Sequence, residues 1–219
     1  GSTHVVIDLP VGPTAKVRSA AAAATLCERL RVVGDALGIH TRFLVTDGSQ
    51  PVGRGIGPAL EARDVLAVLR REPGAPDDLR ERSLRLAAEV VEMAGKSAVG
   101  QGYALAAEVL ASGRALEKFE EICEAQGGMR EPAAARHRRA ILAPRAGFVA
   151  AIDNRQLARA AKLAGAPGDP TAGVELHTPL GGRVEKGQPL YTVHSDAPGE
   201  LAYALGYVSD HPDIIIITD

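Results

Sequence analysis

The stretch Val5–Ser19, VVIDLPVGPTAKVRS, constrains the fold of this chain more than any other. Three β-branched residues end at Asp8, and a loop rich in Gly and Pro follows before an alanine-rich helix opens. A strand that breaks into such a loop ahead of a helix is a common place for α/β proteins to bind anions. Lys16 and Arg18 add positive charge there, and Thr14 adds a hydroxyl. A plain strand-to-helix turn with solvated basic residues would show the same pattern.

The residues that follow predict a parallel β-α-β unit. Ser19–Leu37 carries large apolar residues at helical spacing, and Gly38 is a typical helix end. These apolar residues are Leu26, Leu30, Val33 and Leu37. Thr41–Thr46 is expected to be a second strand, and the connection is long enough for a parallel crossover. Because two parallel strands make a poor sheet, we expect further strands from elsewhere.

A second loop, Gln50–Pro58, contains the glycines Gly53, Gly55 and Gly57. Glycines at this density allow close backbone approach or positive φ. Their spacing matches neither the dinucleotide-binding fingerprint nor the P-loop. The loop therefore predicts at least the entry into a helix over 58–71, with a proline in its first turn.

The predicted fold class is α/β, in two parts. Residues 1–131 combine the two strands with a helical run, and residues 132–139 read as a linker. Residues 140–219 change to short strands punctuated by Gly and Pro, with one or two helices, which indicates a small, strongly bent β module. The helices of the first part are expected at 58–71, 77–95, 103–112 and 114–126.

Composition narrows the class of protein. The net charge of −2 and the absence of a basic block interleaved with aromatics argue against nucleic-acid binding. No apolar run reaches the length of a membrane span, and no signal peptide is recognisable. With 3% aromatics and no Trp, the core must be aliphatic.

Cys27 and Cys123 lack metal-ligand spacing and indicate buried thiols in a reducing compartment, the cytoplasm. The opening Gly1-Ser2, without Met, suggests a cloning remnant or a piece of a longer protein.

No catalytic constellation can be assembled from spacing. The six histidines show no ligand spacing, and neither a nucleophile triad nor a carboxylate pair stands out. The segment Gly182–Tyr191 has the glycine, hairpin and lysine pattern of a lipoyl or biotinyl carrier. Lys186 lacks the flanking residues that a modifying enzyme would read, so a plain β-turn is favoured.

Five sequence blocks in a fixed order carry a resemblance to a known family. They are DLPVGPTAKVRS at 8–19, TDGSQPVGRGIGPALEARDVLAVL at 46–69, SGRALEKFEEICEAQGG at 112–128, GFVAAIDNRQLARAAKLAGAP at 147–167 and AGVELHTPLGGRVEKGQPLYTVHS at 172–195. The chain resembles the thymidine and pyrimidine-nucleoside phosphorylases. Its DLPVGPTAKVR form is most similar to their archaeal-type branch, which includes AMP phosphorylases. The resemblance covers nearly the whole chain.

The resemblance implies the carboxyl-terminal half of such an enzyme. That half comprises the second part of the central α/β domain and then the small α/β "hammerhead" domain. The phosphate-binding loop and the catalytic residues of this family precede the matched region, so no catalytic residue is expected here. The isolated chain is accordingly expected to be inactive.

The resemblance also points to site residues. Lys16 is implied to contact the substrate, with Thr14 as a weaker neighbour, and a lysine at a strand-helix junction could neutralise a nucleotide's 5′-phosphate. Some family members hold a hard cation through oxygen ligands. The corresponding positions here are the carbonyls of Val52 and Gly55 and the side chain of Asp64. An exposed, purely structural Asp64 is an equally good interpretation.

The implied activity is phosphorolysis, in which inorganic phosphate is a co-substrate and no organic cofactor is needed. Thymidine or uridine is one candidate substrate. A nucleoside 5′-monophosphate such as AMP is the other, and Lys16 favours it. A different class remains open as well, namely a non-catalytic binding or assembly module. By resemblance the parent protein is expected to be a homodimer that acts away from membranes.

Overall fold

The computed structural model describes residues 1–219, which form two compact units. The N-terminal unit contains residues 1–48 and 67–130, and the C-terminal unit contains residues 49–66 and 131–219. The sequence-based division differs from these units in one segment, because residues 49–66 pack with the later part of the chain. The division into domains 1–131 and 140–219 stays a prediction.

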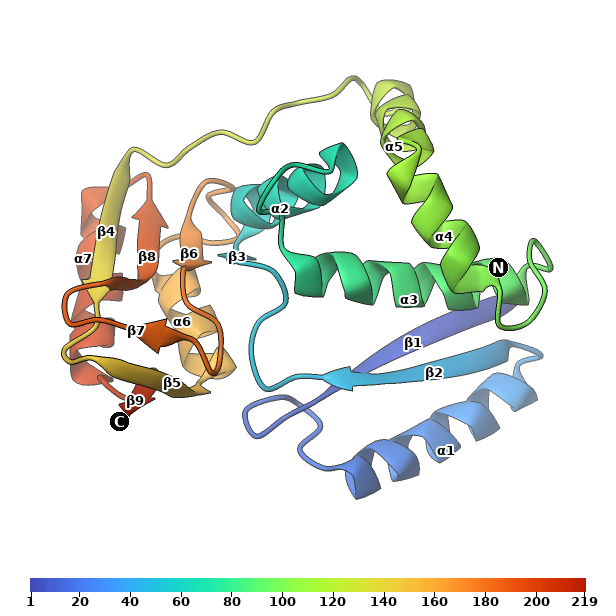
Figure 1. Cartoon of the computed structure of the whole chain (residues 1–219), viewed down its shortest axis with the longest axis horizontal. Helices are drawn as coiled ribbons and strands as arrows, with labels where there is room; N and C mark the ends of the chain where they lie inside the picture. Colours follow the sequence, from blue (N-terminus) through green and yellow to red (C-terminus); the bar gives the residue numbers. More distant parts are fainter. The chain divides into compact units, whose positions relative to one another are not determined.

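The N-terminal unit is built around a two-stranded parallel sheet. β1 (His4–Val11) pairs with β2 (His40–Asp47) in register from His4 opposite His40 to Val11 opposite Asp47. Its helices are α1 (Ala20–Ala36), α3 (Asp77–Met93), α4 (Gly102–Ala111) and α5 (Arg114–Ala125). Helices α1 and α3 cover opposite faces of the sheet (Figure 1). The expected parallel β-α-β unit is confirmed, and its sheet has only these two strands.

Strand β1 is longer than the sequence indicated. It continues beyond Asp8 through Pro10, and the loop begins only at Gly12. A proline is tolerated here because a two-stranded sheet consists of edge strands, where a missing N–H need not break a ladder. Asp8 therefore lies within the strand rather than in the loop.

Helix α1 has the predicted limits but buries a different face. Its first turn is capped by the Ser19 hydroxyl, which accepts the Ala22 N–H at 3.2 Å. The residues against the sheet are the small Ala23 and Gly34, whereas Leu37 is 68% exposed. A side chain at Gly34 would lie 2.8 Å from the Thr41 methyl group. Because Gly34 lets α1 approach the sheet closely, the helix buries this small-residue face. The expected apolar face, with Val33 and Leu37, is therefore partly exposed.

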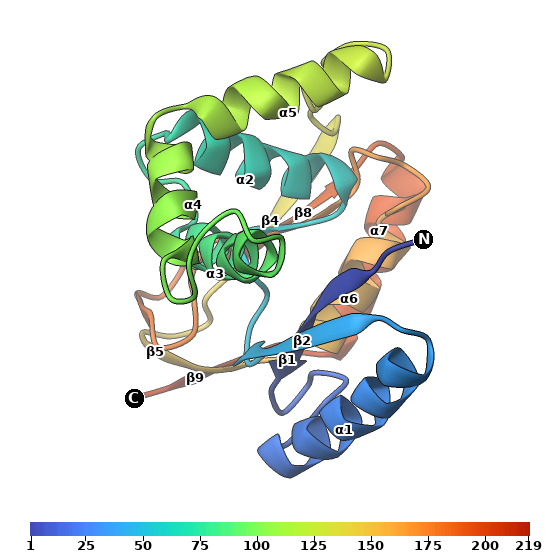
Figure 2. The ribbon, with the colours of Figure 1, turned by 90° about the vertical axis from the view of Figure 1, so that its right-hand side faces the viewer.

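The C-terminal unit is a mixed α/β module with two antiparallel sheets. In one sheet the strand order is β3-β6-β8-β4, and in the other it is β7-β5-β9. Its strands are β3 (Gly55–Ile56), β4 (His137–Leu142), β5 (Gly147–Ile152), β6 (Gly173–Leu176), β7 (Arg183–Val184), β8 (Pro189–Ser195) and β9 (Ile215–Thr218). Its helices are α6 (Asn154–Leu163) and α7 (Pro198–Asp210), which pack side by side (Figure 2). Helix α2 (Pro58–Arg70) belongs to this unit as far as Leu66.

The core of the C-terminal unit is aliphatic, as the composition predicted. Leu157, Val174 and Val193 are completely buried between the helices and the sheets. Tyr191 is the one aromatic residue among the buried apolar side chains, and its burial raises the pKa of the phenol. The N-terminal unit has a much smaller core, of Val68, Leu84 and Leu110.

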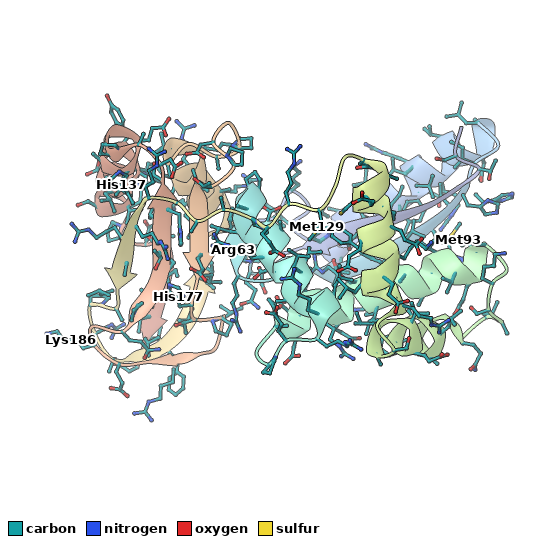
Figure 3. All side chains as sticks on the ribbon, turned by 90° about the horizontal axis from the view of Figure 1, so that it is seen from above. Arg63, Met93, Met129, His137, His177 and Lys186 are labelled. Atoms are coloured by element: carbon teal, nitrogen blue, oxygen red, sulfur yellow. The ribbon has the colours of Figure 1, made fainter.

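The segment before β4 is anchored to helix α2 within the C-terminal unit. Nη2 of Arg63 donates to the carbonyl of Ala133 at 2.6 Å, and Figure 3 shows Arg63 near this extended segment. The N–H of Arg136 donates to Asp196 at 2.9 Å. Strand β4 begins at His137, so the stretch 132–139 includes the first three residues of a strand.

Helix α6 begins at a side-chain cap. Asp153 accepts the N–H groups of Arg155 and Gln156 at 2.9 and 3.0 Å. Asp153→Ala leaves these donors without their acceptor and should lower the free energy of unfolding of the C-terminal unit by about 1 kcal/mol. Urea unfolding of both proteins measures the loss. Asp153→Asn, which retains an accepting oxygen, should keep most of the stability.

Candidate functional site

The loop after β1 is a compact, hydrogen-bonded turn. The N–H of Gly12 donates to the carbonyl of Val17, and the N–H of Ala15 donates to the carbonyl of Gly12, both at 3.1 Å. Val17 also forms an isolated parallel bridge with Val11. Residues 12–17 therefore form a closed loop at the carboxyl end of β1, immediately before the N-terminus of α1.

Two basic side chains without an ion pair lie on or next to this loop. Lys16 and Arg18 are exposed and form no ion pair within the chain, while Thr14 is half-buried. The first turn of α1 contains no acidic residue, so its free N–H groups add to the positive potential. The structure thus places Lys16 and Thr14 on one loop at the carboxyl edge of a parallel sheet, where α/β proteins bind anions. That they contact a substrate stays a prediction.

A polar network lies directly beneath this edge. Asp8 on β1 accepts a hydrogen bond from the Thr46 hydroxyl on β2 at 2.6 Å and faces Arg82 of α3 at 3.5 Å. Arg82 also donates to the main-chain carbonyl of Asp47. Both partners of Asp8 are therefore side chains, one on β2 and one on α3. Arg82 was missed by sequence reasoning. The sequence signal that could have indicated it is the seven-residue spacing of Arg82 and Glu89, which places both charged residues on the same side of α3.

A second charged network lies farther toward the amino end of the strands. Arg42 on β2 pairs with Glu89 at 2.9 Å and with Glu92 at 3.5 Å, both on α3. Glu92 also accepts the N–H groups of Gly100 and Gly102, each at 2.9 Å. The hydrogen bond from Gly102, supported by those from Gly100 and Arg42, lowers the pKa of Glu92. This carboxylate ties the end of α3 to the start of α4.

The lowered pKa of Glu92 gives a prediction for acid stability. A carboxylate whose pKa is lower in the folded than in the unfolded state stabilises the fold above the ordinary glutamate pKa, and this stabilisation is lost as the pH falls through the folded value. Glu92→Gln should therefore unfold more easily than wild type at pH 7, and the two should converge on acidification. Urea unfolding from pH 7 to pH 3 measures this. The exposed Glu120→Gln is the control, and a difference independent of pH would contradict the assignment.

A hollow of about 440 Å³ lies beside this network in the N-terminal unit. Its cations are already neutralised by neighbouring acids, since Arg42 faces Glu89 and Glu92, and Arg31 faces Glu28 at 2.9 Å. Its lining residues are His4, Arg31, Asp35, His40, Thr41, Arg42, Glu92 and Met93. Both arginines that line this hollow are thus paired with acids, unlike Lys16 and Arg18 of the loop after β1.

The glycine loop is organised by Asp64 of α2. One oxygen of its carboxylate accepts the N–H groups of Arg54 and Gly55 at 2.6 and 2.8 Å. The groups that surround this oxygen are hydrogen-bond donors, whereas a hard cation needs converging oxygens. The geometry therefore fits a loop-capping role of Asp64 better than a cation site. A cation at Val52, Gly55 and Asp64 stays a prediction.

The glycines of this loop let its backbone pack closely against other backbone segments of the protein. Gly57 adopts φ +135°, and a side chain there would lie 2.3 Å from the carbonyl oxygen of Ala172. At Gly55 a side chain would collide with the backbone of Leu60, 2.4 Å away. The absence of side chains at Gly55 and Gly57 thus allows β3 to lie between β6 and the first turn of α2.

A carboxylate-imidazole pair lies on β6 and β8 of the C-terminal unit. His194, only 2% exposed, contacts Glu175 at 3.2 Å through Nε2, and its Nδ1 has no partner. The contact with His194 is the main cause that lowers the pKa of Glu175. Next to it, His177 and Thr192 contact each other at 2.7 Å. These contacts join two neighbouring strands and give the histidines a structural role.

Lys186 occupies a tight turn between β7 and β8. The N–H of Gln188 donates to the carbonyl of Glu185 at 3.0 Å, and Gly187 has φ +85°. Figure 3 shows Lys186 at the outer end of this unit. The arrangement is that of an ordinary β-turn with an exposed lysine, the interpretation favoured from the sequence.

Other kinds of site find no support in the side-chain geometry. No three His, Cys, Asp or Glu side chains come together in a way that could hold a metal ion. None of the helices is both long and apolar enough to cross a membrane.

Comparison with known proteins shows what the chain is similar to. Residues 148–213 match the pyrimidine nucleoside phosphorylase C-terminal domain. "Putative thymidine phosphorylase 2" of Acidovorax sp. (strain JS42) is 61% identical over the whole chain, which covers 43% of that protein. The chain matches the carboxyl-terminal half of a pyrimidine nucleoside phosphorylase family member. The resemblance carried by the five sequence blocks is thereby confirmed.

Further phosphorylase relatives show the same coverage. "Putative thymidine phosphorylase" of Polaromonas sp. (strain JS666 / ATCC BAA-500) is 59% identical over the whole chain and 43% of its own length. The protein of that name from Legionella pneumophila (strain Paris) is 55% identical over 99% of the chain and 42% of its own length. The chain thus spans less than half the length of these curated relatives.

Proposed function

We propose that the full-length protein containing this chain is a thymidine phosphorylase-type pentosyltransferase. An oxygen of inorganic phosphate attacks C1′ of the nucleoside and forms the new C–O bond. The C1′–N bond breaks, and its electron pair leaves with the base, which takes up a proton. The products are the free base and a (deoxy)ribose 1-phosphate. The names of the relatives and the unpaired cations at the carboxyl edge of the β1-β2 sheet support this proposal.

In this reaction the residues of the chain bind and orient rather than transfer protons. Lys16, on a loop closed by two main-chain hydrogen bonds, offers an ammonium group to an anionic part of the substrate. The rigid loop holds this charge in place before the substrate arrives, so less ordering is needed at the moment of reaction. The base-side and phosphate-side groups would come from the rest of the protein. We therefore propose that the isolated chain is inactive.

A second candidate substrate is a nucleoside 5′-monophosphate such as AMP. The observation that favours it is the exposed Lys16 without an ion pair, because a lysine ammonium binds phosphate as a point charge. Thymidine has no such group, and the names of the relatives favour thymidine. The cytoplasm and a homodimeric assembly belong to the same proposal, as inferences from the family resemblance.

The test is base release by the full-length protein with thymidine, uridine, AMP, CMP and UMP, with and without phosphate. The proposal predicts release that requires phosphate, from at least one of these substrates. Chain 1–219 alone, freed of full-length enzyme, should release none. A full-length protein that releases no base would favour the alternative of a non-catalytic binding or assembly module.

A further inference from the structure

Arg82 joins both strands of the parallel sheet to helix α3 within the N-terminal unit. Its Nη1 lies 3.5 Å from Oδ2 of Asp8 on β1, and its Nη2 donates to the main-chain carbonyl of Asp47 on β2. The side chains of Arg82 and Asp8 are 18% and 23% exposed. A planar guanidinium can reach two acceptors on different strands at once, which a single ammonium group cannot do.

The other oxygen of Asp8 makes a shorter contact. It accepts the hydroxyl proton of Thr46, 2.6 Å away on β2, and Thr46 is only 7% exposed. Each carboxylate oxygen of Asp8 thus faces a different element, one toward β2 and one toward α3. Removal of Arg82 would leave a half-buried carboxylate with one of its two partners.

This network lies at the carboxyl ends of β1 and β2, next to the loop 12–17 that carries Lys16. The N–H of Gly48, directly after Asp47, donates to the carbonyl of Val11 at 2.8 Å. Val11 is the last residue of β1, and the closed turn 12–17 with Lys16 starts from it. A side chain at Gly48 would lie 3.1 Å from Pro10, so the two strand ends are in close contact. The position of the loop therefore depends on contacts that Arg82 holds together.

We propose that Arg82 is a positioning residue for the Lys16 loop, and that it sets the affinity for the anionic group that Lys16 binds. This proposal rests on the proposed function, because the anionic group is taken to be the 5′-phosphate of the substrate. Arg82 itself touches no substrate in this account. It acts through Asp8 and the strand ends.

The experiment uses the full-length protein with Arg82→Met and Arg82→Lys. Methionine keeps an apolar stem against the sheet but removes both donors, and lysine restores charge with a single donor group. Arg85→Met is the matched control, because Arg85 lies on the same helix, is exposed and forms no ion pair. Values of kcat and KM are measured for AMP and for adenosine, and for UMP and uridine, so that each pair differs only in the 5′-phosphate.

We expect Arg82→Met to raise KM for the nucleotides by roughly five- to tenfold, the loss for a charge-assisted contact that is displaced rather than removed. For the nucleosides KM should stay within about twofold, and kcat should change little for either class. Arg82→Lys should fall between Arg82→Met and wild type. In a Lys16→Ala background, Arg82→Met should add no further loss, since the two act on one contact. Equal losses for nucleotide and nucleoside would overturn the proposal.

A second measurement does not depend on activity. Hydrogen exchange of the Gly12 and Ala15 amides, which close the turn, is compared between wild type and Arg82→Met without substrate. Faster exchange of these amides, with the amides of α5 unchanged, supports the positioning role. Unchanged exchange at Gly12 and Ala15 overturns it. If exchange quickens while the full-length protein shows no phosphorolysis, the proposed function fails but the positioning of the loop by Arg82 stands.

Discussion

Replacement of Lys16 by alanine in the full-length protein should lower kcat/KM for nucleoside 5′-monophosphates about 10- to 100-fold, the loss of one hydrogen bond to a charged group. Turnover of thymidine and uridine should stay within about twofold, because these substrates offer no anionic group to the loop. The effect is large because Lys16 has no ion pair within the chain and its loop is already closed by main-chain hydrogen bonds. No acidic group of the chain therefore neutralises its charge.

The control for this prediction is Lys96→Ala, an exposed lysine of the same unit. It removes the same charge from the protein without touching the loop, so its kcat/KM should match wild type for every substrate. Steady-state kinetics with matched nucleotide and nucleoside pairs separate the outcomes. If Lys16→Ala turned over nucleotides as wild type does, the loop would not bind the substrate phosphate, and Lys16 would be part of the scaffold.

The second large effect is expected at Gly57, where alanine should lower the free energy of unfolding of the C-terminal unit by more than about 3 kcal/mol or prevent folding. An added Cβ would lie 2.3 Å from the carbonyl oxygen of Ala172 and 3.1 Å from Cα of Gly173, so main chain would have to move. The backbone at Gly57 also has φ +135°, which L-residues rarely adopt. The steric clash and the unfavourable backbone conformation therefore both destabilise the alanine variant.

Gly206→Ala is the matched control, because it adds the same methyl group inside helix α7. Nothing lies within 4 Å of a Cβ there. Since alanine favours a helix over glycine, this variant should be more stable by about 0.5–1 kcal/mol. Urea unfolding of both variants, with soluble yield as a second reading, makes the comparison. Similar stabilities for the two alanine variants would show that the close contact of β3 with β6 is not required.

Local sequence signals predicted the elements well. The limits of α1, α2 and α6 follow from Ser19, Pro58 and Asp153, each of which acts within one turn of its own position. The parallel pairing of β1 with β2 followed from the length of the connection. The loop over 12–17 was predicted for the same reason, since a strand, a Gly/Pro turn and a helix are continuous in sequence.

Contacts between distant segments were not predictable from the sequence. The packing of residues 49–66 with the C-terminal unit depends on Gly57 meeting Gly173 of β6, far along the chain. The partner of Asp8 is likewise an arginine on a later helix, and nothing next to Asp8 indicates it. The buried face of α1 was misjudged because Gly34, which carries no hydrophobic signal, sets how closely the helix approaches the sheet.

The most direct test of the proposed function is the identity of the sugar product. The full-length protein is incubated with thymidine or AMP and inorganic phosphate, and the reaction is followed by ³¹P NMR. Phosphorolysis predicts a pentose 1-phosphate signal that grows in step with free base and is absent without added phosphate. Free base accompanied by unphosphorylated sugar, or formed equally well without phosphate, would mean hydrolysis and would contradict the account.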